Sequence, residues 1–253
     1  MNKIKLNNSI ICFIPILVFL PISLQIIYKF HLGGIDLFFD FLKSALIPKI
    51  NNEIIYILIK RLNETIFISI LSWIISINLG IIFGVLSSDI FYNFIKIPIL
   101  IKVFIRFILT IIRSLHEFIW CLILIQIFGM NLSIGILAIC IPFTAINAKV
   151  IREQIDLINS KKIESIKNLE ANRFISLISI LWSTISKTLN NFGAYRLECC
   201  IRSTSILGLF GIGGIGTSLF LSFQALNFRE MWTYLWSLVF LIIIFNYLLN
   251  KLK

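Results

Sequence analysis

Residues 65–87 read TIFISILSWIISINLGIIFGVLS and contain no charged side chain. A helix needs about 20 mostly apolar residues to cross a bilayer core of about 30 Å, and this stretch provides them. The rest of the 253-residue chain is similar: it is 58% hydrophobic and only 14% charged, with a mean hydropathy of +0.97. A soluble domain carries roughly 25% charged residues. The sequence therefore predicts an all-α integral membrane protein.

Five further apolar runs bring the expected number of transmembrane helices to about six. In chain order the expected spans are residues 8–28, 65–87, 115–128, 132–148, 185–207 and 231–249. The third is short and begins at His116 and Glu117. No metal-binding cluster or nucleophile accompanies these two residues in the sequence, so we expect them to have a structural role at the membrane interface.

The distribution of basic residues predicts the orientation, because Lys and Arg concentrate in cytoplasmic loops. With the N-terminus inside, fifteen of the 23 Lys and Arg residues fall in inner segments, six in outer segments and two within a span. Both termini are then cytoplasmic, which requires an even number of spans. The net charge of +11 reflects this topology and contact with anionic membrane lipid, and not nucleic-acid binding.

Two stretches between the spans are expected to be more than simple loops. Residues 33–44 (GGIDLFFDFLKS) form a short amphipathic segment, expected at the outer surface. Residues 91–106 (FYNFIKIPILIKVFIR) place Lys96, Lys102 and Arg106 among apolar side chains. This pattern indicates either an interfacial helix on the inner side or a tilted additional span.

The longest cytoplasmic segment is expected at residues 149–187, and its centre, residues 161–183, reads KKIESIKNLEANRFISLISILWS. Ile163, Ile166, Leu169 and Arg173 recur at helical spacing. A short amphipathic helix exposed to the cytosol is a natural docking element for another protein. An ordinary solvated loop helix would show the same pattern.

Residues 195–216 read YRLECCIRSTSILGLFGIGGIG and combine glycines with charges inside an apolar run. The spacing G-x-G-x-x-G occurs here, but a dinucleotide site would need a preceding strand and a soluble βαβ unit. Glycines at this density allow a non-helical turn, which survives at membrane depth only if it is buried or lines a wet cavity. Both tight helix packing and a gate segment fit this pattern.

Arg196, Glu198 and Arg202 are the ionisable residues of the fifth span. Such groups face the protein interior or water, since each costs about 2.5–3.5 kcal/mol at a helix centre. Glu198 and Arg202 are four residues apart and can pair along the helix, whereas Arg196 and Glu198 point to different faces. The cluster fits either a structural ion pair that fixes packing or a path for anions lined by Arg196.

Two of these stretches carry a resemblance to a known family. Residues 164–183 resemble the EAA loop of ABC-importer permeases: Glu164, Ser165 and Ile180 match, whereas Glu170, Trp182 and Ser183 stand at its Gly, Leu and Pro. Residues 195–216 look like the signature of phosphonate-importer permeases, with Cys200 in place of an Asn. Residues 64–65 and 113–120 are also similar to that family. The resemblance runs from about residue 63 to the C-terminus.

The resemblance implies a MetI-like ABC-importer permease fold in residues 63–253, preceded in residues 1–62 by a transmembrane helix and the outer amphipathic segment. It implies a bacterial inner-membrane subunit that moves phosphonate, phosphite or phosphate by alternating access. The candidate ATPase-coupling residues are Glu164, Ser165, Leu169 and Ile180. The candidate path or gate residues are Arg196, Glu198, Arg202, Gly208, Gly211, Gly213, Gly214 and Gly216.

The sequence also lacks the patterns that an enzyme or ATPase would need. It has no G-x-x-x-x-G-K-[ST] stretch, so we expect a separate ATP-binding subunit and no cofactor of the chain's own. The five cysteines have no metal-binding or redox spacing and are expected as core residues. A periplasmic or lipid-anchored binding protein would deliver the cargo, and a homodimer would enclose the path. Another cargo such as an amino acid, and a membrane-embedded enzyme or channel, remain the alternatives.

Overall fold

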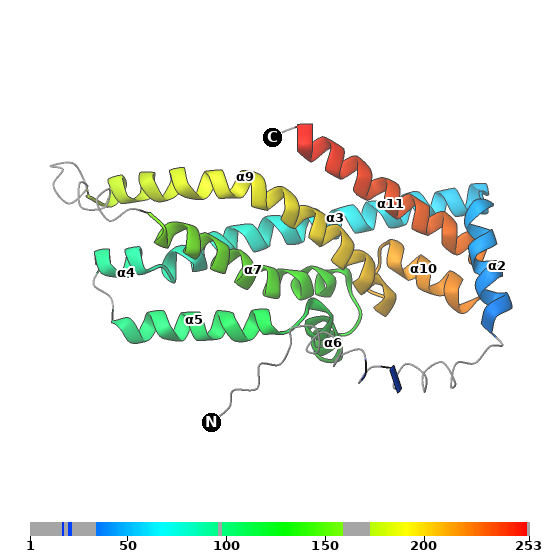
Figure 1. The fold of residues 1–253 in the computed structure, drawn as a ribbon, viewed down its shortest axis with the longest axis horizontal. Coiled ribbons are helices and arrows are strands. Elements are labelled where there is room, and N and C mark those ends of the chain that lie inside the picture. Colours follow the sequence, from blue (N-terminus) through cyan, green and yellow to red (C-terminus); the bar gives the residue numbers. More distant parts are fainter. Residues whose placement is uncertain (1–16, 18–19, 22–33, 96–97, 159–172, 252–253) are drawn as a thin grey trace, which may run out of the picture. The chain divides into compact units, whose positions relative to one another are not determined.

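A computed structural model describes residues 17, 20–21, 34–95, 98–158 and 173–251 (Figure 1). Within these residues the secondary structure is helical, with no strand. The principal elements are α2 (Ile35–Leu46), α3 (Asn52–Leu86), α4 (Asp89–Ile95), α5 (Ile99–Ser114), α6 (Glu117–Phe128), α7 (Leu132–Asp156), α9 (Arg173–Leu207), the 3-10 turn η2 (Gly208–Phe210), α10 (Ile215–Gln224) and α11 (Phe228–Lys251).

The chain divides into two compact units, residues 1–47 and residues 48–253. Helix α2 belongs to the first unit and covers most of the amphipathic segment expected at residues 33–44; its aromatic residues Phe38 and Phe39 are exposed. The first expected span, residues 8–28, lies almost wholly outside the described residues. The sequence analysis divides the chain between residues 62 and 63, and this division stays a prediction. Helix α3 runs without a break across that point.

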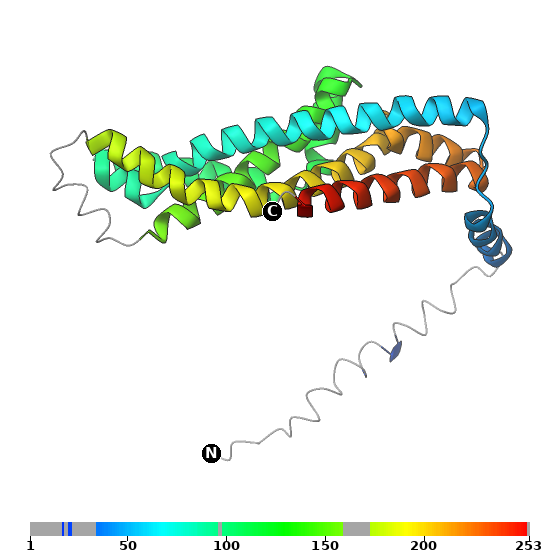
Figure 2. The same cartoon turned by 90° about the horizontal axis from the view of Figure 1, so that it is seen from above.

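Helices α3 and α7 form the centre of the second unit and lie side by side (Figures 1 and 2). The small residues Ser72, Ser76, Gly80 and Gly84 of α3 are buried against α7. A Cβ added at Gly80 would lie 2.5 Å from the Cβ of Asn147, so the two backbones approach too closely for a larger residue. Small residues at such contacts are the usual means by which membrane helices pack.

Three helices are long and apolar enough to cross a membrane: α3, α7 and residues 228–249 of α11. Two bent pairs also satisfy the same criteria, namely α5 with α6 at 91° and the end of α9 with α10 at 44°. Spans 65–87, 132–148 and 231–249 are therefore confirmed as helices of sufficient length. The described residues give at most five spans, so the six that the sequence predicts are not confirmed.

The third expected span, residues 115–128, is too short to cross a membrane by itself and meets the criteria only as part of the bent pair with α5. It is the 12-residue helix α6, whose length of about 18 Å is well short of a bilayer core. The chain breaks after Ser114, and His116 then caps α6 by accepting a hydrogen bond at Nδ1 from the Phe118 amide, at 3.3 Å. Residues 91–106 fall on α4 and α5, which are separate helices with Pro98 capping the start of α5.

The helix that holds the fifth expected span, residues 185–207, begins before it, because α9 starts at Arg173. The part of α9 that meets the criteria for crossing a membrane, as one half of a bent pair with α10, begins at Phe192. Leu177, Leu181 and Ile185 recur at four-residue spacing and are buried against Ile151 and Ile155 of α7. This apolar stripe packs the first half of α9 against α7.

The two ends of the bundle hold different connections. The end of α7, the start of α9 and α4 lie at one end, on the left in Figure 1, where the amide of Asp89 donates to Asp156 at 2.8 Å. The start of α3 and the α10–α11 connection lie at the other end, where the Lys49 amide donates to the Arg229 carbonyl at 3.1 Å. Helix α4 therefore lies at the same end of the bundle as the end of α7 and the start of α9, which flank the expected coupling segment.

Candidate functional site

A glycine turn separates α9 from α10, at the position that the sequence pattern singles out. Helix α9 ends at Leu207 and is followed by one 3-10 turn. Gly211, Gly213 and Gly214 then adopt φ values of +81°, +112° and +77°. Residues with a Cβ rarely occupy this region, whereas glycine does so readily. The predicted non-helical turn is present, and it redirects the chain into α10.

The turn is closed by direct backbone packing. A Cβ added at Gly208 would lie 2.8 Å from the Cα of Gly216, and one added at Gly216 would lie 2.0 Å from the Ser205 carbonyl oxygen. Both glycines are buried. The end of α9 and the start of α10 therefore lie in backbone contact, and this packing holds the bend.

Helix α3 anchors the turn through two hydrogen bonds. The Gly214 amide donates to Oε2 of Glu64 at 2.9 Å, and the Ile215 amide donates to Oγ1 of Thr65 at 2.9 Å. Arg61 in turn pairs with the same Glu64 oxygen at 2.8 Å. The carboxylate and hydroxyl satisfy amides at the start of α10, which would otherwise lack partners. Two segments that resemble the same family, 150 residues apart in sequence, thus meet here.

Arg196 is buried on α9, with only 7% of its surface exposed. Its guanidinium carbon lies 4.8 Å from the ring centroid of Phe143, 4.9 Å from that of Phe192 and 6.0 Å from that of Tyr195. Stacking on aromatic rings stabilises a cation without neutralising it. Its Nε has no hydrogen-bond partner, and no described carboxylate forms an ion pair with Arg196. A buried cation without a counter-ion is costly, so this position is suited to an anion.

Glu198 and Arg202 form the ion pair that their spacing predicts. The side chain of Arg202 is 57% exposed and that of Glu198 is 14% exposed. The pair therefore lies apart from Arg196, on another face of α9, and does not neutralise it. Glu117 contacts α9 separately, by accepting a hydrogen bond from the Ser203 hydroxyl at 2.7 Å.

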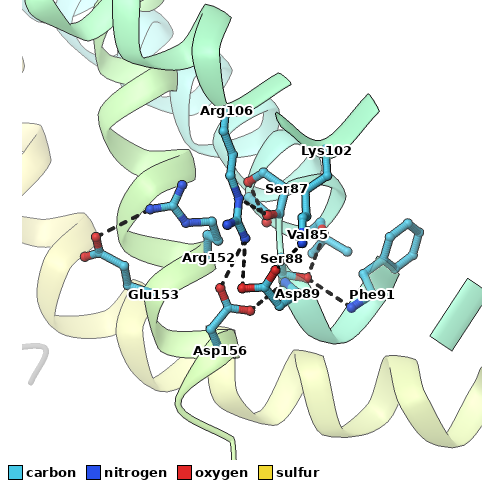
Figure 3. Close-up of polar contacts among 11 residues, drawn as sticks. Val85, Ser87, Ser88, Asp89, Phe91, Lys102, Arg106, Arg152, Glu153 and Asp156 are labelled. Atoms are coloured by element: carbon cyan, nitrogen blue, oxygen red, sulfur yellow. Dashed lines mark hydrogen bonds and ion pairs between the residues drawn. The ribbon is translucent and has the colours of Figure 1, made fainter. Parts of the chain in front are cut away.

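An ion-pair network that the sequence analysis missed joins four helices at the end of the bundle that carries α4 (Figure 3). Arg106 donates from Nε to the Ser87 carbonyl at 2.8 Å, and its Nη2 lies 3.2 Å from Asp89 and 3.6 Å from Asp156. Lys102 bonds Asp89 at 2.6 Å, and this bond holds the pKa of Asp89 below its ordinary value. The sequence contains one indication of this network, because Asp89 and Asp156 occur among the basic residues near these helix ends.

The ATPase-coupling residues are only partly covered by the structure. Glu164, Ser165 and Leu169 lie outside the described residues, whereas Ile180 is half-buried on α9. Helix α7 reaches Asp156 and α9 begins at Arg173, so helices extend into both ends of the expected coupling segment. No group of three His, Cys, Asp or Glu in the described part of the chain could hold a metal ion. Cys121, Cys140 and Cys200 are buried core residues.

The geometry defines a class of protein: a helical membrane subunit with a glycine turn anchored inside the bundle. Its fold is the MetI-like fold of ABC-importer permeases. The inward-facing MetNI methionine ABC transporter contains a chain with TM-score 0.70 and 18% identity, covering 80% of this chain and 97% of that one. An amino acid ABC transporter crystallised with histidines contains one with TM-score 0.63 and 18% identity, covering 78% and 92%.

Sequence relatives point to particular transporters within this class. A putative cryptic phosphonate transport permease of Escherichia coli is 23% identical over 117 residues, which is 46% of this chain and 96% of that protein. A phosphate-import permease of Mycolicibacterium smegmatis is 24% identical over 120 residues, covering 47% of this chain but 23% of that protein. The p69 permease of Mycoplasma genitalium is 28% identical over 189 residues, covering 74% and 33%.

No model of a protein family matches the chain. The solved structures nevertheless confirm the predicted fold, and the sequence relatives confirm the predicted likeness to phosphonate-type permeases. Together they support a transport permease of the ABC-importer class.

Proposed function

We propose that this chain is the membrane-spanning subunit of an ATP-driven importer for phosphonate or a related oxyanion such as phosphite or phosphate. The observation that carries the proposal is Arg196, a buried guanidinium without an anionic partner among the described residues. It lies on the helix that leads into the anchored glycine turn. The names of the relatives, which include phosphonate, phosphite and phosphate permeases, support the same cargo class.

The chemistry of Arg196 favours an oxyanion over a cation or a neutral solute. A guanidinium offers several N–H donors in a planar fork that matches phosphoryl and phosphonyl oxygens. The rings of Phe143 and Phe192 fix its plane and leave its charge available. Glu198 does not compete, because it pairs with Arg202. A passing oxyanion would therefore find one oriented cation in a largely apolar surrounding.

The proposed gate is the glycine turn formed by Gly208, Gly211, Gly213, Gly214 and Gly216. Alternating access requires one part of the bundle to rock against another. A turn that combines positive φ values with close backbone contact can change direction at glycine positions without steric penalty from side chains. The Glu64 and Thr65 anchors define its observed state.

Coupling to ATP hydrolysis is proposed for the segment between α7 and α9. Glu164, Ser165, Leu169 and Ile180 would contact an ATP-binding subunit in the cytoplasm. The network around Arg106 ties the end of α7, three residues before the segment that is not described, to α3, α4 and α5. Motion of the segment would therefore reach several helices together.

The remaining features of the proposal follow from the class. The protein would reside in the bacterial inner membrane with both termini cytoplasmic, in contact with anionic lipid. It would act as a homodimer that encloses the path, and a periplasmic or lipid-anchored binding protein would deliver the cargo. Most of the specificity would then lie in that binding protein.

The test is uptake of radiolabelled methylphosphonate by the complete complex in proteoliposomes. Arg196→Ala should lower the maximal rate about 10- to 100-fold, since losing one hydrogen bond to a charged group costs about 1.5–3 kcal/mol. The concentration giving half-maximal uptake should be unchanged. Lys187→Ala is the matched control, because Lys187 is an exposed cation on the same helix.

Two results would contradict the proposal in different ways. Undiminished uptake by Arg196→Ala would make Arg196 a packing residue. Failure of the unmodified complex to take up methylphosphonate, phosphite or phosphate, with methionine or another amino acid accepted instead, would replace the cargo and leave the importer class intact.

A further inference from the structure

A groove lies at the end of the bundle opposite α4, between α3, α10 and α11. It has a volume of about 300 Å³. The residues of its lining that carry polar groups are Tyr56, Lys60, Arg61, Ser218, Ser222, Glu230 and Tyr234. Ligand pockets in proteins are about 300–1,000 Å³ and contain a few convergent polar groups among apolar ones. The size therefore suits a small solute, and the wall is mostly apolar with a few polar groups.

The floor of the groove carries hydroxyl groups that are almost fully buried. Tyr234 is 1% exposed, and Ser218 and Ser222 are each 6% exposed. Leu221 and Ile57 provide the apolar part of the wall. The Tyr234 hydroxyl is hydrogen-bonded within the floor, to Glu230 and to Ser218, so the Ser222 hydroxyl is the group of the floor that can donate to an anion.

Two cations and one carboxylate set the charge of the lining. Lys60 forms no hydrogen bond or ion pair with any residue that the structure describes, and its side chain is exposed at the groove. Arg61 is paired with Glu64, which lies outside the lining. Glu230 is the opposing charge, and its Oε2 accepts from Nδ2 of the Asn227 side chain at 2.6 Å. Because Glu64 neutralises Arg61, Lys60 is the cation of the lining that has no anionic partner among the described residues.

We propose that this groove binds a phosphoryl or phosphonyl oxyanion, with Lys60 and Arg61 as its charged ligands and the Ser222 hydroxyl as a donor. This inference rests on the proposed function, and it assigns a second position to the cargo, outside the span that holds Arg196. The same chemistry also fits the phosphate of a phospholipid headgroup, since residues 52–62 precede the uncharged stretch of α3 at the boundary of the bilayer.

The groove is linked to the glycine turn by one shared residue. Arg61 contacts the groove and also holds Glu64, which in turn accepts the hydrogen bond from Gly214. An oxyanion in the groove would compete with Glu64 for Arg61. An occupied groove would then weaken the hydrogen bond between Glu64 and the Gly214 amide. The binding of cargo would in this way change the state of the proposed gate.

The test uses cysteine protection in the complete complex. Ser222→Cys is introduced after the five native cysteines have been replaced, and its reaction with N-ethylmaleimide is followed in nanodiscs. In galactolipid discs, which lack phosphate, methylphosphonate should slow the reaction about threefold at a concentration of about twice its Kd, because the free fraction falls as 1 + [L]/Kd. Lys60→Gln should abolish the protection. Lys49→Gln, which removes a charge outside the lining, should not.

Phosphatidylglycerol discs separate the two sources of the oxyanion. If a headgroup is the occupant, labelling will be slower in these discs than in galactolipid discs, Lys60→Gln will restore the rate, and methylphosphonate will have no effect. Ser218→Cys serves as a second reporter in case Ser222→Cys does not assemble. The inference is overturned if neither methylphosphonate nor phosphatidylglycerol protects either reporter, or if protection is unchanged in Lys60→Gln.

Uptake measured on the same preparation separates this inference from the proposed function. If the complex takes up methylphosphonate but neither reporter cysteine is protected, oxyanion binding in the groove is wrong and the proposed function stands. If a reporter cysteine is protected but the complex takes up no oxyanion, binding in the groove stands and the proposed function is wrong.

Discussion

Gly216→Ala tests whether close backbone packing maintains the turn between α9 and α10. The added Cβ would lie 2.0 Å from the Ser205 carbonyl oxygen, 1.4 Å short of the 3.4 Å at which ordinary contact begins. The opposing atom belongs to the backbone of α9 and cannot rotate away. Overpacking of this kind costs about 1–3 kcal/mol, and the better helix propensity of alanine returns about 1 kcal/mol.

Gly193→Ala is the matched control for this substitution. Gly193 is also a buried helical glycine, but its added Cβ would lie 3.6 Å from Cδ1 of Ile77, in ordinary contact. This variant should gain the helix-propensity term without the clash, so the two variants should differ by about 3 kcal/mol at the upper end of the overpacking range.

The assay is thermal unfolding of the purified protein in detergent, followed by tryptophan fluorescence. At this chain length a change of 1 kcal/mol shifts Tm by roughly 2–4 °C, so Gly216→Ala should melt about 6–12 °C below Gly193→Ala. If Gly216→Ala melts as high as Gly193→Ala, the backbone of α9 does not lie against the start of α10 as described, and the account of the turn is wrong.

Three further predictions concern the network around Arg106 and the orientation of the chain. Arg106→Ala should lower Tm more than Arg113→Ala, because Arg113 on the same helix contacts only the hydroxyl of a neighbouring threonine; equal losses would contradict the role of the network. Asp89 has a lowered pKa, so its contribution to stability is present above its ordinary pKa of about 4 and is lost as pH falls through the lower folded value. Unfolding measured between neutral pH and pH 3 should show this loss, and Asp89→Asn should reduce it. A cysteine at Asn227 should react with an impermeant maleimide on spheroplasts and one at Ser160 should not; the reverse pattern would invert the topology.

Much of the fold could be predicted because the signal is local. The apolar stretches in α3, α7 and α11 are long enough to be recognised from composition alone. The break in the third expected span could not be predicted in the same way. The bend of 91° lies at the start of that span, between Ser114 and Glu117, and depends on where α5 ends and on the cap provided by His116. Hydropathy does not register either feature.

In the candidate site, too, features within one segment could be predicted and contacts between distant segments could not. The glycine turn and the pair formed by Glu198 and Arg202 follow from spacing within one segment, and both are present. The anchor from Glu64 to Gly214 spans 150 residues, and the contact between Arg106 and Asp156 joins separate helices. Such contacts depend on how the helices pack, which no periodicity in a single segment reveals. The sequence could indicate only that these charged residues need partners.

The most direct test of the central claim is to purify the tagged chain from its native membrane in mild detergent and to identify its stable partners. The account predicts that an ATP-binding subunit with a phosphate-binding loop copurifies with it, and that Glu164→Lys abolishes this association while the variant remains in the membrane. A chain that purifies without any ATP-binding subunit, or a Glu164→Lys variant that retains its ATPase and transports normally, would contradict the account.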